Sequence, residues 1–238
     1  MAKLANVDIS YNERLFEKKG LRSYYHTARY RWIRSEIGKR SLTDYKCLEI
    51  GCFDGKLLDY LDTQPAEYVG IDANWENGLD LARARFGGRS DIVLLETTDP
   101  ASLDAYEDGH FDISVALETL EHMPDDILTD YLRQLARVTK DWLFVSVPIE
   151  IGPVFLAKHL GKSLRYGLGE QYTLREVVSA TLGRSQDVAR DQHKGFDYRK
   201  LAAQIEEYFD DVEVSGIPFS VGSPALSMTV GIVAKARR

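Results

Sequence analysis

A turn containing Gly51 and Gly55 follows a short apolar run at residues 46–50 and precedes a helical pattern. Glycines between a strand and a helix allow backbone N–H groups to approach a ligand closely. A second strand-like run at residues 68–71 ends at Asp72. A carboxylate at that position can accept hydrogen bonds from both hydroxyls of a ribose. These residues predict a nucleoside-binding crevice at the carboxyl ends of parallel strands.

The same turn discriminates between kinds of nucleoside. A dinucleotide fold uses G-x-G-x-x-G to bring bare amides to a pyrophosphate, whereas this turn reads Gly51-Cys52-Phe53-Asp54-Gly55. Glu49 would repel a pyrophosphate and suits a cationic ligand. S-adenosylmethionine (SAM) carries a sulfonium and an ammonium group and no phosphate. The pattern Glu-x-Gly-x-x-x-Gly, followed by an acid at the end of the next strand, resembles motifs I and II of class I SAM-dependent methyltransferases.

The resemblance implies positions around the cofactor. In that family the strand-end acid binds the ribose, and a polar residue after the third strand, here Asp99 or Thr98, meets the adenine. Asp99 precedes Pro100 in a pattern that equally suits a helix cap. Phe53 departs from the family, which has a third glycine there, and its side chain is expected to narrow the turn near the methionine part. The cofactor-binding residues implied are Glu49, Gly51, Cys52, Phe53, Asp72, Ala73, Thr98, Asp99, Leu117 and Glu118.

Two histidines are candidates for catalysis. His122 ends a Leu-Glu-Thr-Leu-Glu-His run after the fourth predicted strand, and the Leu-Glu-His string resembles that of small-molecule and quinone methyltransferases. An imidazole can take a proton near neutral pH, so His122 is a candidate general base, although it can equally cap or pack the next helix. His193 is a second candidate for a base or for orienting a hydroxyl, with a merely exposed position as the alternative. The histidines do not pair at metal-ligand spacing, so no metal is predicted.

Strand-like and helical segments alternate along the chain. This alternation predicts an α/β fold with a doubly wound, mostly parallel sheet, and the last two strands, joined by a short turn, must be antiparallel. The layout matches the seven-stranded, Rossmann-like methyltransferase fold. The run at 91–95 is continuously apolar, as in a buried parallel strand. Strands are expected at 46–50, 67–72, 91–95, 111–116, 142–147, 212–217 and 226–234, and helices at 12–37, 55–62, 79–86, 125–138 and 196–209.

The length of the chain favours one domain with decorations. Residues 1–40 are expected to form an N-terminal helical cap, and residues 41–238 a SAM-binding methyltransferase domain. The connection at about 149–195 is longer than a minimal one and contains Gly161, Gly167 and Gly169 as flexible joints. An insertion here lies over the acceptor site in the resembling fold, so we expect a substrate lid.

Composition limits the partners. A formal net charge of −7 argues against non-specific nucleic-acid binding, which needs clustered positive charge. No apolar run reaches the roughly 18 residues of a transmembrane helix, so no stable membrane insertion is expected. The N-terminus lacks the apolar core of a signal peptide. Cys47 and Cys52 are predicted to be reduced thiols, which favours a cytoplasmic enzyme. The oligomeric state is unknown from the sequence.

Three functions compete. The leading one is a SAM-dependent methyltransferase acting on an oxygen or nitrogen atom of a small metabolite, sugar or lipid-linked acceptor. The second is an NAD-dependent α/β oxidoreductase, which the missing G-x-G-x-x-G disfavours. The third is a non-catalytic SAM-binding module without an acceptor pocket, which Asp72 and the Glu121-His122 pair disfavour.

Overall fold

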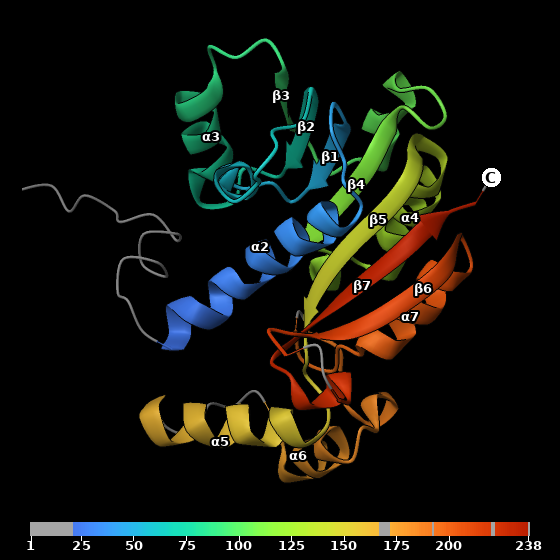
Figure 1. Ribbon diagram of the computed structural model, residues 1–238. Coiled ribbons are helices and arrows are strands. Elements are labelled where there is room, and N and C mark those ends of the chain that lie inside the picture. Colours follow the sequence, from blue (N-terminus) through green and yellow to red (C-terminus); the bar gives the residue numbers. More distant parts are fainter. Residues whose placement is uncertain (1–20, 167–171, 192, 220–221, 238) are drawn as a thin grey trace, which may run out of the picture.

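The protein is built around one seven-stranded sheet (Figure 1). The computed structural model describes residues 21–166, 172–191, 193–219 and 222–237. The strand order is β3-β2-β1-β4-β5-β7-β6. The strands are β1 (Lys46–Ile50), β2 (Glu67–Asp72), β3 (Ile92–Glu96), β4 (Phe111–Leu117), β5 (Thr139–Pro148), β6 (Phe209–Ile217) and β7 (Thr229–Ala236).

The direction of the strands follows the sequence prediction. The first five strands pair in parallel. β7 lies antiparallel between β5 and β6, with Ile232 opposite Val145 on one side and Val214 on the other. The α/β class and the mostly parallel sheet with an antiparallel C-terminal hairpin are therefore confirmed.

Helices cover both faces of the sheet (Figure 1). α2 and α3 share one apolar core, to which they contribute Ile33 and Leu79. α4 and α7 pack on the opposite face through a second core that includes Leu132 and Leu201. The described α-helices are α2 (Leu21–Lys39), α3 (Gly78–Phe86), α4 (Asp125–Val138), α5 (Pro153–Tyr166), α6 (Leu174–Thr181) and α7 (Tyr198–Glu206).

Two elements differ from the sequence prediction. Residues 55–62, predicted to be a helix, form only a 3-10 turn at Lys56–Asp59, and the polar run that follows leads into Pro65, which does not sustain a helix. The predicted burial of the third strand is also wrong. β3 is an edge strand that pairs with β2 alone, and Val93 is 40% exposed. The strand is apolar because its side chains pack on both faces of the sheet, Leu94 against one core and Leu95 against the other.

The described part of the predicted N-terminal cap is the single helix α2, which runs through Gly38 to Lys39. The predicted helix start near residue 12 lies outside the described residues. Among the described residues, no helix combines the length and the apolarity that a membrane crossing requires.

The chain between β5 and β6 adds α5 and α6 beyond the end of β5, in yellow and orange in Figure 1. Phe155, Ala180 and Val188 form a small apolar cluster within this segment. Gly161 lies inside α5, so it belongs to a continuous helix and is not a joint. The other two predicted joints, Gly167 and Gly169, lie outside the described residues.

Gly231 of β7 allows α2 to dock on the sheet. A Cβ at Gly231 would lie 2.5 Å from the ring of Trp32, which also contacts Phe144 edge-on. We predict that Gly231→Ala lowers the free energy of unfolding by about 1–3 kcal/mol, because overpacking forces the ring to move. Urea unfolding measures this effect. Gly88→Ala is the matched control, since a Cβ at Gly88 meets nothing within 4 Å. Equal stability of the two variants would contradict the docking of α2 on Gly231.

Candidate functional site

Three neighbouring strands carry predicted cofactor residues at their carboxyl ends. Gly51 follows β1, Asp72 ends β2 and Glu118 follows β4. The winding of the chain reverses between β1 and β4, and ligands of open α/β sheets bind beyond the strands at such a point. Gly51 (φ 76°) and Glu118 (φ 55°) both have a left-handed backbone. Backbone strain of this kind gathers at functional sites.

The N–H groups of the turn after β1 donate within the protein. The sequence suggested that these amides approach a ligand, and in the structure four of them have acceptors within the protein. A pyrophosphate would therefore find few donors in this turn, whereas a cationic ligand does not need them. The N–H groups of Gly51 and Cys52 donate to the Ile71 carbonyl (2.7 and 3.2 Å). The Phe53 N–H donates to Asp72 Oδ2 (3.0 Å), and the Gly55 N–H donates to the Cys52 carbonyl (2.8 Å).

Gly51 also packs directly against the segment that follows β4. A Cβ at Gly51 would lie 2.1 Å from Thr119 Oγ1, so the position requires glycine for space as well as for its φ. Thr119 Oγ1 donates to the Leu117 carbonyl (3.2 Å). Glu118 is held by its N–H, which donates to the Ser146 carbonyl (2.8 Å). The turn after β1 and the segment after β4 thus form one continuous wall.

Asp72 is the acid at the end of β2. Its Oδ1 accepts from the Asn74 N–H (2.8 Å), and its Oδ2 accepts from the Phe53 N–H (3.0 Å). Partial burial raises the pKa of Asp72, while these backbone hydrogen bonds oppose the shift. A carboxylate offers about four lone-pair sites, and the backbone N–H groups of Phe53, Asn74 and Trp75 act on it, so acceptor capacity remains for a hydroxyl group of a ligand. The side chain is therefore both an anchor of the turn and an available acceptor.

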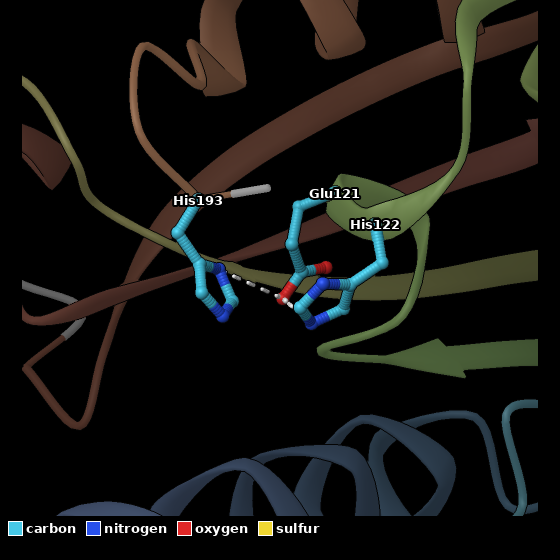
Figure 2. Close-up of side chains that lie close together, drawn as sticks. All are labelled: Glu121, His122 and His193. Carbon is cyan, nitrogen blue, oxygen red and sulfur yellow. Dashed lines mark ion pairs between the residues drawn. The ribbon is translucent and has the colours of Figure 1, made fainter. Parts of the chain in front are cut away.

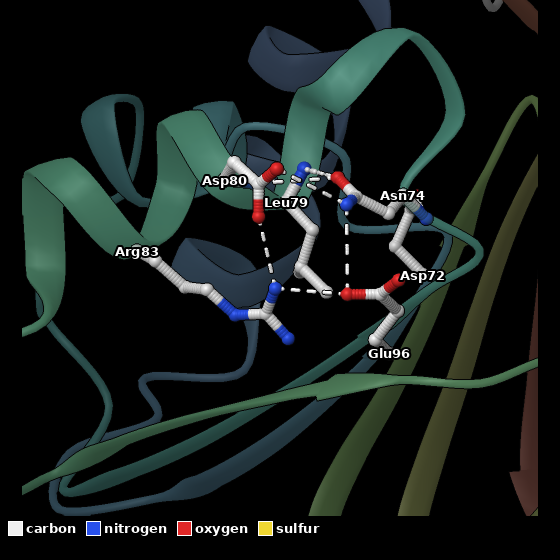
Figure 3. Close-up of polar contacts among 6 residues, drawn as sticks. All are labelled: Asp72, Asn74, Leu79, Asp80, Arg83 and Glu96. Atoms are coloured by element: carbon white, nitrogen blue, oxygen red, sulfur yellow. Dashed lines mark hydrogen bonds and ion pairs between the residues drawn. The ribbon is translucent and has the colours of Figure 1, made fainter.

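Asn74 connects the end of β2 to α3 (Figure 3). Its Oδ1 accepts from the N–H groups of Leu79 and Asp80 (3.1 and 3.3 Å). Its Nδ2 donates to Asp80 (3.3 Å) and Glu96 (3.5 Å), and Arg83 bridges the same two carboxylates at 3.0 and 2.9 Å. This network fixes the position of the chain immediately after Asp72.

Phe53, which replaces the family's third glycine, has a left-handed backbone (φ 47°). Its ring packs against Gly78, where a Cβ would lie only 2.2 Å from the nearest ring carbon. The ring centroids of Phe53 and Trp75 are 6.0 Å apart. The ring therefore turns toward the start of α3. This differs from the expected narrowing of the turn near the methionine part, and the missing side chain of Gly78 explains the room for it.

Glu49 lies inside β1 and is 3% exposed. Its carboxylate accepts a hydrogen bond from the hydroxyl of Tyr68. Burial raises the pKa of Glu49 to about 8, and the carboxylates of Asp54 and Asp72 add to the shift. Cys52, beside it, is a buried free thiol, as is Cys47. Glu49 is therefore largely protonated at neutral pH until a positive charge approaches it.

Arg29 of α2 is a functional candidate that the sequence reasoning missed. Its guanidinium lies over the ring of Tyr30 at 4.9 Å and donates to the Tyr30 hydroxyl (3.3 Å). Burial raises the pKa of Glu118, and Arg29 is the largest opposing charge. Arg29 likewise opposes the raised pKa of Glu49. The sequence shows four arginines in this helix, and only the docking of α2 reveals which one lies in electrostatic reach of Glu118 and Glu49.

The predicted adenine residues lie at the ends of β2 and β3. Ala73, Thr98 and Asp99 are all exposed. The Thr97 N–H donates to the Asp72 carbonyl (3.0 Å), which ties the two strand ends together. Asp99 Oδ1 accepts from the Ala101 N–H (2.9 Å) at the start of a 3-10 helix, Pro100–Ala105. The helix-cap alternative for Asp99 is confirmed, and its adenine contact stays a prediction.

The two candidate histidines lie together although they are far apart in the sequence. The ring centroids of His122 and His193 are 4.3 Å apart. The carboxylate of Glu121 lies close to both rings (Figure 2), 3.9 Å from His122 Nε2 and 4.0 Å from His193 Nδ1. We call these three residues the Glu121 cluster. It follows Glu118 on the chain, so it borders the wall formed by Gly51 and Thr119.

Within the cluster, the pKa values of Glu121 and His122 are shifted in opposite directions. Burial raises the pKa of Glu121 well above its ordinary value, and the nearby Glu118 adds to the shift. Partial burial lowers the pKa of His122, and Arg190 contributes to this shift. The carboxyl group is completely buried, while the two imidazoles are 47% and 45% exposed.

The residues present fit a cationic nucleoside that also bears a carboxylate, which is the chemistry of SAM. Asp72 has free acceptor capacity for a ribose, and Glu49 is a buried acid that a nearby cation would ionise. Arg29 supplies a positive charge for a carboxylate on the same side of the cleft. The space beside Gly51 admits no Cβ. A pyrophosphate, by contrast, would meet several acids and engaged amides.

Comparison with known proteins agrees with this geometry. Residues 21–181 match the sequence model of a family described as "Methyltransferase domain". The chain is similar to the ubiquinone biosynthesis O-methyltransferase of Bordetella parapertussis, with 31% identity over 118 residues that cover 48% of this chain and 46% of that protein. The protein of the same name from Paraburkholderia phymatum is 27% identical over 169 residues, which cover 71% and 67% of the two chains. The chain spans about half the length of several curated relatives that it matches.

A solved structure is similar over most of both chains. The methyltransferase domain of bacterial CtHen1 superposes with a TM-score of 0.56 at 17% identity, covering 89% of this chain and 99% of that one. This likeness concerns the fold.

Glu49 generates a pH prediction. The folded chain holds the Glu49 proton up to a pKa of about 8, whereas the unfolded chain releases it near 4.5. The folded state therefore binds more protons between these values, and this contribution to stability falls as pH rises through them. We predict that the wild type loses more stability than Glu49→Gln between pH 4.5 and 8, because glutamine cannot ionise. Urea unfolding across this range measures both proteins, and parallel stability curves would contradict a protonated Glu49.

Proposed function

Because the chain belongs to the methyltransferase-domain family, we propose that it transfers a methyl group from SAM to a hydroxyl oxygen of a small-molecule acceptor. SAM is the cofactor of this family and fold. The relatives named O-methyltransferases support oxygen as the accepting atom. Acceptors related to quinone precursors are the first to test, since those relatives are named for ubiquinone biosynthesis.

The observation that carries the proposal is the close packing of Gly51 against Thr119. It joins the nucleoside side of the cleft, with Asp72, to the side that bears the Glu121 cluster. A cofactor on one side and an acceptor on the other would meet at this junction. Holding two reactants in line accounts for a large part of the rate of such a transfer.

When bound, SAM supplies an already activated methyl group, so the protein's work is binding, orientation and exclusion of water. We assign Asp72 to the ribose hydroxyls, Glu49 to the ammonium and Arg29 to the carboxylate. Cys52 and Phe53 shape the turn. Leu117 and Glu118 border the methionine side, and Ala73, Thr98 and Asp99 border the adenine.

His122 and His193 are assigned to the acceptor, whose hydroxyl they would orient. The two-helix segment α5–α6 is proposed as the cover of the acceptor side, within the predicted lid at 149–195, and residues 1–40 as an N-terminal cap. The position of α5 and α6 beyond the end of β5 supports the role of this segment as a cover. The free thiols of Cys47 and Cys52 support a reducing, cytoplasmic location.

The proposal is tested by incubating the full chain with SAM and a panel of hydroxylated small molecules, including phenols, quinols and sugars. We expect at least one acceptor to gain the mass of one methyl group, with S-adenosylhomocysteine formed in equal amount. Binding of SAM with no methylated product across the panel would favour a non-catalytic SAM-binding module. Binding of NAD in place of SAM would overturn the assignment altogether.

Asp72 provides a test of the cofactor side. We predict that Asp72→Ala weakens the binding of S-adenosylhomocysteine about 10- to 100-fold, since a hydrogen bond to a charged group contributes about 1.5–3 kcal/mol. Isothermal titration measures the dissociation constant. Asp91→Ala is the matched control, because Asp91 pairs with Arg89 before β3. Asp72→Asn, which keeps one acceptor for the turn, separates ligand binding from folding. An unchanged dissociation constant in both Asp72 variants would remove this residue from the site.

A further inference from the structure

Glu121 is a buried acid whose side chain is not satisfied. It is 0% exposed, and neither carboxylate oxygen accepts a hydrogen bond from any residue that the structure describes. Leaving a buried polar group without a partner costs about 1–3 kcal/mol, and more for a charged one. Arg190 donates to the backbone carbonyl of Glu121 (2.5 Å), so its charge lies nearby while the two carboxylate oxygens stay without a hydrogen bond among the described residues. The buried carboxylate therefore points to a ligand.

The fold brings two imidazoles to this carboxylate by specific contacts. His122 ends the 3-10 helix Leu120–His122 that also carries Glu121. His193 is presented by a tight loop in which Asp191 and Lys194 form paired backbone hydrogen bonds of 3.1 and 2.8 Å. The Arg190 contact ties this loop to Glu121. The arrangement is thus supported by backbone contacts and is not a chance approach of exposed side chains.

The spacing within the Glu121 cluster is close to that of a metal centre. One ligand atom from each residue lies within 4.8 Å of the others. His122 Nε2 and His193 Nδ1 are 3.9 and 4.0 Å from Glu121 Oε1. Ligand atoms at about 2.0–2.1 Å from a tetrahedral zinc ion lie about 3.3 Å apart. Small rotations of side chains that are half exposed would close this gap.

The geometry points to a divalent transition-metal site formed by Glu121, His122 and His193, with at least one coordination position left open. Two imidazoles and one carboxylate are a donor set that zinc uses in catalytic sites, where a fourth position stays open. Magnesium and calcium prefer oxygen ligands throughout, so the imidazoles favour zinc, cobalt or a similar ion. The exposed sides of both rings leave access for the ion.

This inference differs from the sequence prediction that no metal site is present. The sequence spacing of the histidines contains no ligand pattern, because His193 reaches Glu121 only through the fold, beside the paired backbone hydrogen bonds of Asp191 and Lys194. It also deepens the proposed function, on which the role of the ion rests. The ion would bind the acceptor's oxygen at its open coordination position and lower the pKa of the acceptor's hydroxyl. The histidines would then act on the acceptor through the ion.

Metal binding is tested on the full chain after removal of any affinity tag and treatment with EDTA. Co²⁺ is titrated in while its visible absorption is followed, and Zn²⁺ is then added to displace it. We expect saturation at one ion per chain and a higher melting temperature with Zn²⁺. Glu121→Gln and His193→Ala should each weaken Co²⁺ binding about 100-fold or more, since even partners of ligands contribute 10–100-fold.

His110→Ala is the matched control, because His110 also pairs with a glutamate, Glu67, at 2.9 Å, but has no second histidine beside it. This variant should bind Co²⁺ like the wild type. Should Glu121→Gln fail to fold, His193→Ala decides, since its side chain is half exposed. Absence of saturable Co²⁺ binding, or binding that both cluster variants retain, would overturn the inference.

The same preparations separate the site from the proposed function. Methyl transfer that persists in EDTA, together with no Co²⁺ binding, would reject the metal site and keep the methyltransferase. Saturable Co²⁺ binding that depends on the cluster, without product from any hydroxylated acceptor, would keep the metal site and reject the proposed O-methyl transfer.

Discussion

Close contact between glycine backbone and side chains is the constraint on which the carboxyl edge of this sheet depends. The side chain of Thr119 packs against Gly51, the ring of Phe53 packs against Gly78, and the sulfur of Cys52 packs against Gly70. Each contact closes a space that a methyl group would occupy. Because β1 and β4 are parallel neighbours, the chains that leave them must turn within a narrow gap. The side chain of Thr119 can occupy that gap because Gly51, on the opposite side of the gap, has no side chain.

The acids beside these contacts are buried, and two described arginines, Arg29 and Arg190, lie in electrostatic reach of them. Burial keeps Glu49, Glu118 and Glu121 at raised pKa values, so these acids carry less negative charge than their number suggests. A cationic ligand reverses this state, because an opposite charge favours the ionised form of each acid. Binding is therefore expected to release protons. These raised pKa values are consistent with the proposed ammonium near Glu49 and the proposed metal ion near Glu121.

The sequence was most informative where neighbouring residues decide the outcome. The apolar period of residues 125–138 predicted α4 with the bounds observed, and the strand-end position of Asp72 followed from local pattern. It was least informative where distant segments meet. The meeting of His193 with Glu121 needs the contact of Arg190 with the Glu121 carbonyl, and the approach of Arg29 needs α2 to dock on Gly231. The acceptors of the turn amides and the edge position of β3 likewise depend on which segments lie alongside.

The docking of α2 has a thermodynamic consequence. This helix carries Arg29 toward the acids of the cleft, and it is seated by the contact of Trp32 with Gly231 and Phe144. Any ligand that Arg29 holds binds only the docked form, so ligand binding and helix docking must strengthen each other by the same free energy. Occupied protein should therefore exchange the amide hydrogens of α2 more slowly than empty protein, and the N-terminal helix becomes a reporter of the state of a site built mainly by the sheet.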